Sequence, residues 1–497
     1  METPILLGIA AGGIVLLLVL IIKFKVQAFV ALLLVSILVG LAAGIPLATI
    51  PETEDAPARL GIIATMIAGM GGTLGTVAIL VALGAMLGRL IEVSGGASSL
   101  ATRFTTLLGP KRVAAALTGA ALVLAIPVFF DVGFIILIPI IYGFSKAAGL
   151  NPVKFGLPVA GIMLAVHVAI PPHPGIVGGA TLLGADLGWV TILGMVTVIP
   201  LGVLTHFVAK RLNRREFTML PATALQFANF GHADETGTGT GTGSGSGSGT
   251  RAPASVGGLR TGTLTATEAP PSAGTILALI LIPLVMIMGG TVAATLLPVG
   301  DPMRAVFEFI GAPIFALLVA LILAFFLLTV RRGWSLAHTG EVMEAALPPV
   351  AIVILVTGAG GVFAKVLTES GVGAALASTL AATGLPILVL GFVLSLVLRA
   401  SQGSATVAIL TTGGLIAPAI LASDYSAIQV ALIALAVAFG ALGLSHVNDS
   451  GFWVVTRYLG LSVADGLRSW TVLTTILGLA GFAIVGLMWL IVTAIGL

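Results

Sequence analysis

Six ionisable side chains lie inside stretches of this sequence that are otherwise apolar. They are Asp131, His167, His173, Arg399, His446 and Asp449. A charge at the centre of a bilayer costs at least about 2.5–3.5 kcal/mol on insertion scales, so each such residue is expected to have a function and a partner. We interpret Asp131, Asp449, His173 and His446 as candidates for carrying a coupling proton. A helix cap is the alternative for both aspartates, and His167 is more simply explained as a histidine satisfied between helices.

Arg399 is the remaining charged residue of this set. Its guanidinium could bind the carboxylate of a substrate. It could instead form a purely structural ion pair with Asp449 or Asp131. The sequence leaves both interpretations open.

Two of the apolar stretches are interrupted at their centres. Residues 165–179 read AVHVAIPPHPGIVGG, and residues 442–452 read LGLSHVNDSGF. Proline removes a backbone donor and clashes with the preceding turn, so a continuous helix through Pro171–Gly175 is not expected. Non-helical backbone at membrane depth is tolerated where it is buried in protein or lines a water-filled cavity, and transporters bind their substrates at such breaks. The two stretches are therefore predicted to form two halves of one substrate site.

Broken helices expose unpaired N–H groups with partial positive charge, which favour an anion such as a carboxylate. Glycines at the breaks allow a ligand to approach the backbone, and neutral polar side chains there could bind the hydroxyls of a small polyhydroxylated acid. The predicted substrate contacts are His173, Gly175, Arg399, Ser401, Gln402, Ser404, Thr406, Asn448, Ser450 and Gly451.

The composition identifies the class of protein that carries these residues. Of 497 residues, 58% are hydrophobic and 8% are charged, which excludes an ordinary soluble protein of this size. Many windows exceed the roughly 20 apolar residues that span a bilayer. The net charge of +3 comes from Lys/Arg-rich loops and does not indicate a nucleic-acid partner. Without cysteine, disulfides and thiolate metal sites are excluded, and we expect no metal and no cofactor.

The two halves of the chain resemble each other. A shift of 276 positions superposes Gly175 on Gly451 and Gly184 on Gly460. Each half is predicted to contribute five crossings, one of them broken, and one re-entrant hairpin, and an odd number of crossings inverts the second copy. The predicted fold is an all-α polytopic membrane protein with two inverted repeats. Residues 1–212 and 273–497 form the repeats, and a cytoplasmic, flexible Gly/Thr/Ser linker occupies residues 213–272.

The hairpins are predicted at residues 113–149, broken around Asp131, and at residues 386–421, broken at 399–406. The other crossings follow hydropathy, with basic loops cytoplasmic. They are predicted at residues 4–22, 28–50, 60–91, 190–209, 274–298, 305–330, 346–367 and 470–495, together with the broken spans 156–187 and 428–460.

Three motifs resemble the gluconate permease family, GntP. They are FFDVGFIILIPIIYGFSKAAGLNPVKFGLPVAGIMLAVHVAIPPHPG (129–175), LRASQGSATVAIL (398–410) and SHVNDSGFW (445–453). The resemblance covers nearly the whole chain except the linker. It implies a bacterial inner-membrane symporter, usually proton-coupled, for gluconate or related sugar acids. It also implies an elevator-type carrier domain and a scaffold that often dimerises, so a homodimer is expected. Carried onto this chain, the hairpin tips are residues 131–133 and 401–406.

Other functions fit the residues less well. A sodium-coupled carrier of another small hydroxy-carboxylate is an alternative, since hydroxyl, amide and carbonyl oxygens also bind Na⁺. An intramembrane hydrolase using Asp131 and Asp449 is a second alternative, but the sequence has no HExxH and no recognisable protease motif around either carboxylate. A passive channel does not explain broken helices in both halves. We therefore expect a transporter and not an enzyme.

Overall fold

The computed structural model describes residues 2–52, 58–109, 112–230, 270–372, 375, 386–447 and 449–496. Every regular element in these ranges is a helix. The helices of the first half are α1 (Thr3–Leu18), α2 (Ala28–Ala42), α3 (Ile62–Val93), α4 (Gly96–Leu108), α5 (Val113–Leu124), α6 (Phe130–Ala148), α7 (Val153–Ala169), α8 (Pro174–Leu183) and α9 (Leu187–Leu212). A short helix, α10 (Pro221–Asn229), follows them.

The second half has the same kinds of element. Its helices are α11 (Ala273–Leu296), α12 (Pro302–Gly311), α13 (Pro313–Ala324), α14 (Leu336–Glu344), α15 (Pro348–Glu369), α17 (Ile387–Gln402), α18 (Ala405–Leu421), α19 (Ala427–Leu442), α20 (Ser450–Leu459), α21 (Val463–Gly466) and α22 (Val472–Ala494). Short π and 3₁₀ turns extend α1 and α13 and precede α22. Within the described ranges, eight helices are long and apolar enough to cross a membrane, which confirms a polytopic all-helical protein.

Both predicted helix breaks are present. In the first, α7 ends at Ala169 and α8 begins at Pro174, a position where the missing N–H of proline leaves no hydrogen bond unmade. In the second, α19 ends at Leu442 and α20 begins at Ser450, with Asp449 as its N-cap. The Asp449 carboxylate accepts a hydrogen bond of 3.1 Å from the Gly451 N–H. Asp449 is therefore a helix cap, which was the alternative to its interpretation as a carrier of the coupling proton.

Two helix pairs occupy the predicted hairpin segments. In the first, α5 and α6 are separated by residues 125–129, so Asp131 lies in the first turn of α6. In the second, α17 runs to Gln402 and α18 starts at Ala405, so the predicted break at 399–406 was too wide. No proline lies there, and only Gly403, with a φ of +82°, has the left-handed backbone that ends the first helix.

Some predicted boundaries were wrong because hydropathy does not register where a helix turns. The span predicted at 28–50 ends at Ala42, since Gly44 has a φ of +84° and Pro46 follows. The span predicted at 305–330 is divided, because Pro313 begins a new helix after α12. Helix α4 was not predicted.

The predicted linker at 213–272 is ordered in its first part. Helix α10 packs against α20, where the Thr223 hydroxyl donates to the Arg457 carbonyl at 2.9 Å. The Leu220 N–H also donates to the Gly460 carbonyl at 2.8 Å. The Gly/Thr/Ser tract, residues 236–250, lies outside the described residues.

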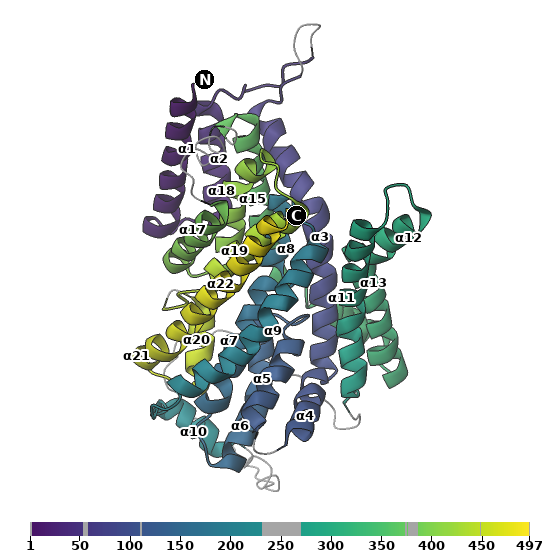
Figure 1. Ribbon diagram of the computed structural model, residues 1–497. Coiled ribbons are helices and arrows are strands. Elements are labelled where there is room, and N and C mark those ends of the chain that lie inside the picture. The colour runs from purple at the N-terminus through teal and green to yellow at the C-terminus, as the bar shows by residue number, and fades with distance from the viewer. Residues whose placement is uncertain are drawn as a thin grey trace, which may run out of the picture.

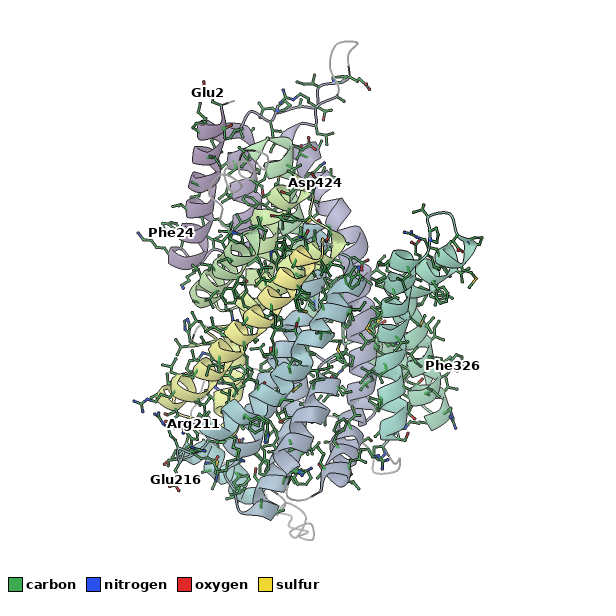
Figure 2. The ribbon with its side chains drawn as sticks, viewed as in Figure 1. Glu2, Phe24, Arg211, Glu216, Phe326 and Asp424 are labelled. Carbon is green, nitrogen blue, oxygen red and sulfur yellow. The ribbon has the colours of Figure 1, made fainter. Side chains whose placement is uncertain are left out.

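The helices form an elongated bundle. Figure 1 shows α4, α5, α6 and α10 toward the lower end, and α1 and α12 toward the upper end. Arg211 and Glu216 lie at the lower end in Figure 2, opposite Glu2 and Asp424. At the centre, nearly every side chain of α7, α18 and α19 is buried. These buried helices position both breaks and the α17–α18 turn.

Candidate functional site

A cavity of about 420 Å³ lies where both hairpin turns and both helix breaks meet. Its volume falls within the roughly 300–1,000 Å³ usual for small-molecule sites. Four helices begin at its wall, with Phe130 of α6, Pro174 of α8, Ala405 of α18 and Ser450 of α20 among the lining residues. The first N–H groups of a helix lack intrahelical partners and carry partial positive charge. Four such ends directed at one cavity form an environment suited to an anion.

Asp131 presents its carboxylate to this cavity. The residue lies in the first turn of α6, lines the cavity and is exposed. No hydrogen bond or ion pair to its side chain occurs within the described part of the chain, and α6 has no side-chain cap. The capping alternative for Asp131 therefore has no support in the structure.

Arg399 and Asp449 form a buried ion pair at the wall of the cavity. One guanidinium NH₂ group of Arg399 donates to the Asp449 carboxylate, and the other donates to the Gly403 carbonyl. The hydroxyl of Ser445 also donates to Asp449 and in turn accepts from the Trp470 indole at 2.7 Å. The side chain of Arg399 is 1% exposed, and its Nε has no partner among the described residues. The pair joins the end of α17 to the second break, and the Nε–H of Arg399 makes no hydrogen bond with the described residues.

The two histidines at the first break differ from expectation: His173 was expected at the substrate site, and His167 was expected to be hydrogen-bonded between helices. His173 is buried at the N-cap position of α8, where its side chain makes no capping hydrogen bond. Its Nε2 lies 2.5 Å from the Ala125 carbonyl, so it connects the break to the α5–α6 turn. His167 lines the cavity instead, with its ring 4.3 Å from that of His173. Its Nδ1 is buried without a hydrogen-bond partner in the described ranges. The interpretation of His167 as a satisfied histidine is therefore wrong for this nitrogen.

The remaining predicted residues divide between lining and packing positions. Ser404, Thr406, Ser450 and Gly451 line the cavity. Gly175 is buried against α18, where an added Cβ would lie 3.2 Å from the Thr406 Cα, so this glycine serves helix packing.

The other predicted contacts do not reach the cavity or are not described. His446 is not among the lining residues, and its Nε2 lies 2.9 Å from the Ala400 carbonyl. Asn448 and the side chains of Ser401 and Gln402 lie outside the described residues.

One wall of the cavity was not predicted. It consists of Ala85, Gly88, Arg89 and Glu92 on α3, and Arg89 donates to Glu92 in an ion pair. The available signal was a pair of opposite charges three residues apart near the end of an apolar helix. In the sequence these residues were interpreted as the end of a crossing.

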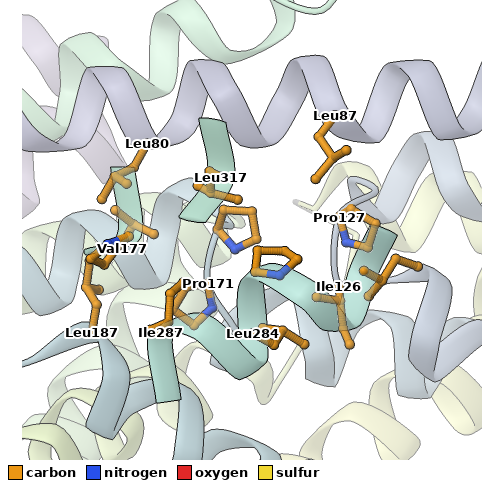
Figure 3. Close-up of a pocket in the computed structure, with 14 residues that line it drawn as sticks. Leu80, Leu87, Ile126, Pro127, Pro171, Val177, Leu187, Leu284, Ile287 and Leu317 are labelled. Carbon is orange, nitrogen blue, oxygen red and sulfur yellow. The ribbon is translucent and has the colours of Figure 1, made fainter. Parts of the chain in front are cut away.

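Behind the cavity, the first break is sealed by apolar side chains. Figure 3 shows Pro127 and Pro171 facing leucines of α3, α11 and α13. The space left between them is about 20 Å³, room for about one water molecule and no ligand. The polar lining of the site therefore lies on the other side of Pro127, where Asp131, Arg399 and Asp449 are found.

A polar cavity at the meeting point of two broken membrane helices and two helix turns is typical of a transporter. The profile of the GntP family permeases matches residues 4–238 and 251–492, so the chain belongs to the GntP permease family. The unmatched residues 239–250 fall within the Gly/Thr/Ser tract. This finding confirms the predicted family and shows a multi-pass inner-membrane permease, not an enzyme.

Curated relatives match over nearly their full length. The chain is 55% identical to the inner membrane permease YgbN of Escherichia coli (strain K12), over 99% of this chain and 100% of that protein. It is 36% identical to the low-affinity gluconate transporter of the same strain, over 98% and 99%. It is 33% identical to the Gnt-II system L-idonate transporter of that strain, over 95% and 96%.

A solved structure shares the fold. The YdaH transporter of Alcanivorax borkumensis superposes with a TM-score of 0.58, covering 94% of this chain and 98% of that chain. The sequence identity is 16%, so the likeness concerns the fold alone.

Proposed function

We propose that the protein is a secondary active transporter that imports gluconate or a related sugar acid together with protons. The observation that carries this proposal is the convergence of four helix N-termini on one cavity that also holds Asp131. The helix ends favour a carboxylate, and the hydroxyls of Thr406 and Ser450 suit the hydroxyls of a sugar acid. Relatives named as gluconate and L-idonate transporters support this substrate class.

Coupling to protons has an energetic reason. An inside-negative membrane potential opposes the entry of a monoanion by about 2.3 kcal/mol per 100 mV. One cotransported proton cancels that charge, and a second would add driving force. Three carboxylates line the cavity, and Asp449 and Glu92 each face an arginine partner. Asp131 is the carboxylate without an ion pair in the described chain, so we assign the coupling proton to it.

We propose that the substrate carboxylate binds at the helix N-termini, next to Arg399. In this arrangement Arg399 would take both roles that the sequence left open, because it pairs with Asp449 and its Nε–H, without a partner among the described residues, would donate to the anion. Contacts from Ser401, Gln402 and Asn448 stay predictions.

Transport by two inverted repeats and an elevator-type movement completes the proposal. The 276-residue shift places α8 (174–183) on α20 (450–459), residue for residue. The α5–α6 pair lies toward the lower end in Figure 1 and the α17–α18 pair toward the upper end, as inversion requires. Helix α3 would be the fixed wall against which the two hairpins and the two broken helices move. A homodimer of the scaffold stays a prediction.

Uptake into proteoliposomes tests the proposal. Labelled gluconate should accumulate when the outside is made acidic, and accumulation should vanish with a protonophore. An imposed sodium gradient at uniform pH is the matched control and should drive nothing. Uptake driven by the sodium gradient would show that sodium, not the proton, is the coupling ion. If neither gradient drives accumulation of any sugar acid, the proposed transport function is refuted.

A further inference from the structure

A second and larger cavity opens at the lower end of the molecule, apart from the site described above. Its volume is about 1430 Å³, and it lies between α4, the starts of α5 and α7, and the ends of α6 and α9. Its lining shares no residue with that of the 420 Å³ cavity. The proposed transport cycle gives it no role.

The mouth of this cavity is strongly basic. Five cations line it, and Glu216 is the one carboxylate among its described lining residues. The cations are Arg112, Lys154, Lys210, Arg214 and Arg215. None of them takes part in an ion pair within the ranges that the structure describes. The uncompensated charge therefore favours an anion.

Apolar side chains also line the cavity, and exposed apolar side chains lie on the helices beside it. Phe144, Phe155 and Pro158 lie among the lining residues. On the helices that flank the cavity, Leu107 of α4 is 64% exposed and Phe207 of α9 is 62% exposed. Helix α9 is long and apolar enough to cross a membrane, so the exposed Phe207 faces lipid. The cavity therefore lies beside the basic end of a helix whose apolar side chains face lipid.

We propose that this cavity binds an anionic phospholipid, with its phosphate among the five cations and its acyl chains against the apolar lining. Basic pockets between membrane helices on the cytoplasmic side bind such headgroups, and the positive-inside rule places this end in the cytoplasm. A sugar acid or free phosphate would use the cations and leave the apolar lining uncovered. Cardiolipin and phosphatidylglycerol have both the charge and the chains.

The test uses the full-length protein in detergent, with thermal unfolding measured against added lipid. Cardiolipin and phosphatidylglycerol should raise the unfolding temperature, whereas phosphatidylethanolamine and sodium phosphate should not. The double variant Arg112→Gln/Lys210→Gln should weaken cardiolipin binding about thirtyfold, at about fivefold for each basic residue lost. The matched control is Arg103→Gln/Arg211→Gln, which removes two exposed cations outside the lining and should bind normally.

Several results would overturn the proposal. One is equal cardiolipin binding by the two double variants. Another is a rise in unfolding temperature with phosphatidylethanolamine as large as that with cardiolipin. A rise produced by sodium phosphate alone would indicate that the cavity binds a soluble anion instead. Should the lining variant fail to fold, photo-labelling of the unchanged protein decides. A phosphatidylglycerol with a photoreactive acyl chain should label peptides containing Phe144 or Phe155, and labelling without that preference would refute the site.

Discussion

Replacing Gly88 by alanine tests the contact between α3 and the first hairpin turn. A Cβ at Gly88 would lie 2.1 Å from the Pro127 carbonyl oxygen, whereas ordinary contacts begin at 3.4 Å. The two backbones would have to separate by about 1.3 Å, the difference between those distances, and packed interiors resist such a shift. Overpacking of this kind costs about 1–3 kcal/mol. The higher helix propensity of alanine offsets at most about 1 kcal/mol of this cost.

Gly75→Ala is the matched control, because it makes the same change on the same helix. A Cβ at Gly75 would meet no described atom within 4 Å, so only the gain in helix propensity remains. The difference between the two variants therefore isolates the packing cost. About 1–3 kcal/mol corresponds to a roughly 5- to 150-fold change in the ratio of two states.

The assays are thermal unfolding in detergent and the initial rate of gluconate uptake. Gly88→Ala should unfold at a lower temperature than Gly75→Ala and should alter uptake, because the arrangement that brings Pro127 against α3 is penalised. Equal unfolding temperatures and equal uptake for the two variants would refute both the close contact and the role of α3 as a wall of the moving part.

Three further predictions concern charge and the linker. Arg399→Gln leaves Asp449 buried without its ion pair, so the free energy of unfolding should fall by about 3–5 kcal/mol. Thermal or denaturant unfolding measures this change, and an unchanged free energy would show that the ion pair does not contribute to stability. Asp131→Asn should abolish pH-driven accumulation while exchange of internal for external gluconate continues, and Asp424→Asn, at the upper end, should change neither. Deleting Thr236–Thr250 should leave uptake nearly unchanged, since a Gly/Thr/Ser coil forms no packed contact, and lost uptake would contradict this.

Helix breaks and turns were predictable because proline and glycine act locally. The Pro171–Pro172 pair ends α7 whatever its tertiary surroundings, and Gly403 ends α17 by its own backbone preference. The end of α2 and the division at Pro313 were missed for a different reason. Hydropathy continues across both positions, and spans placed by hydropathy pass over the local signals of Gly44, Pro46 and Pro313.

The residues of the site were predictable in type but not in direction. Helix α7 is buried on all sides, so no polar face indicates which histidine points at the cavity. His167 faces the cavity while His173 fastens the break, and only the packing of the α5–α6 turn decides this. Arg89 and Glu92 were missed because a neighbouring helix supplies them to the cavity, which no local pattern reveals.

The charges around the cavity give the proposed coupling a physical basis. Arg399 with Asp449, and Arg89 with Glu92, are neutral pairs, so among the described lining residues the net charge depends on Asp131 alone when histidine is neutral. An ionised Asp131 repels an incoming carboxylate, and a protonated Asp131 does not. The anion therefore binds the protonated protein more tightly, and by linkage the bound anion holds the proton equally well. Asparagine at position 131 fixes the neutral form, which should preserve anion binding while removing the dependence of that binding on protons.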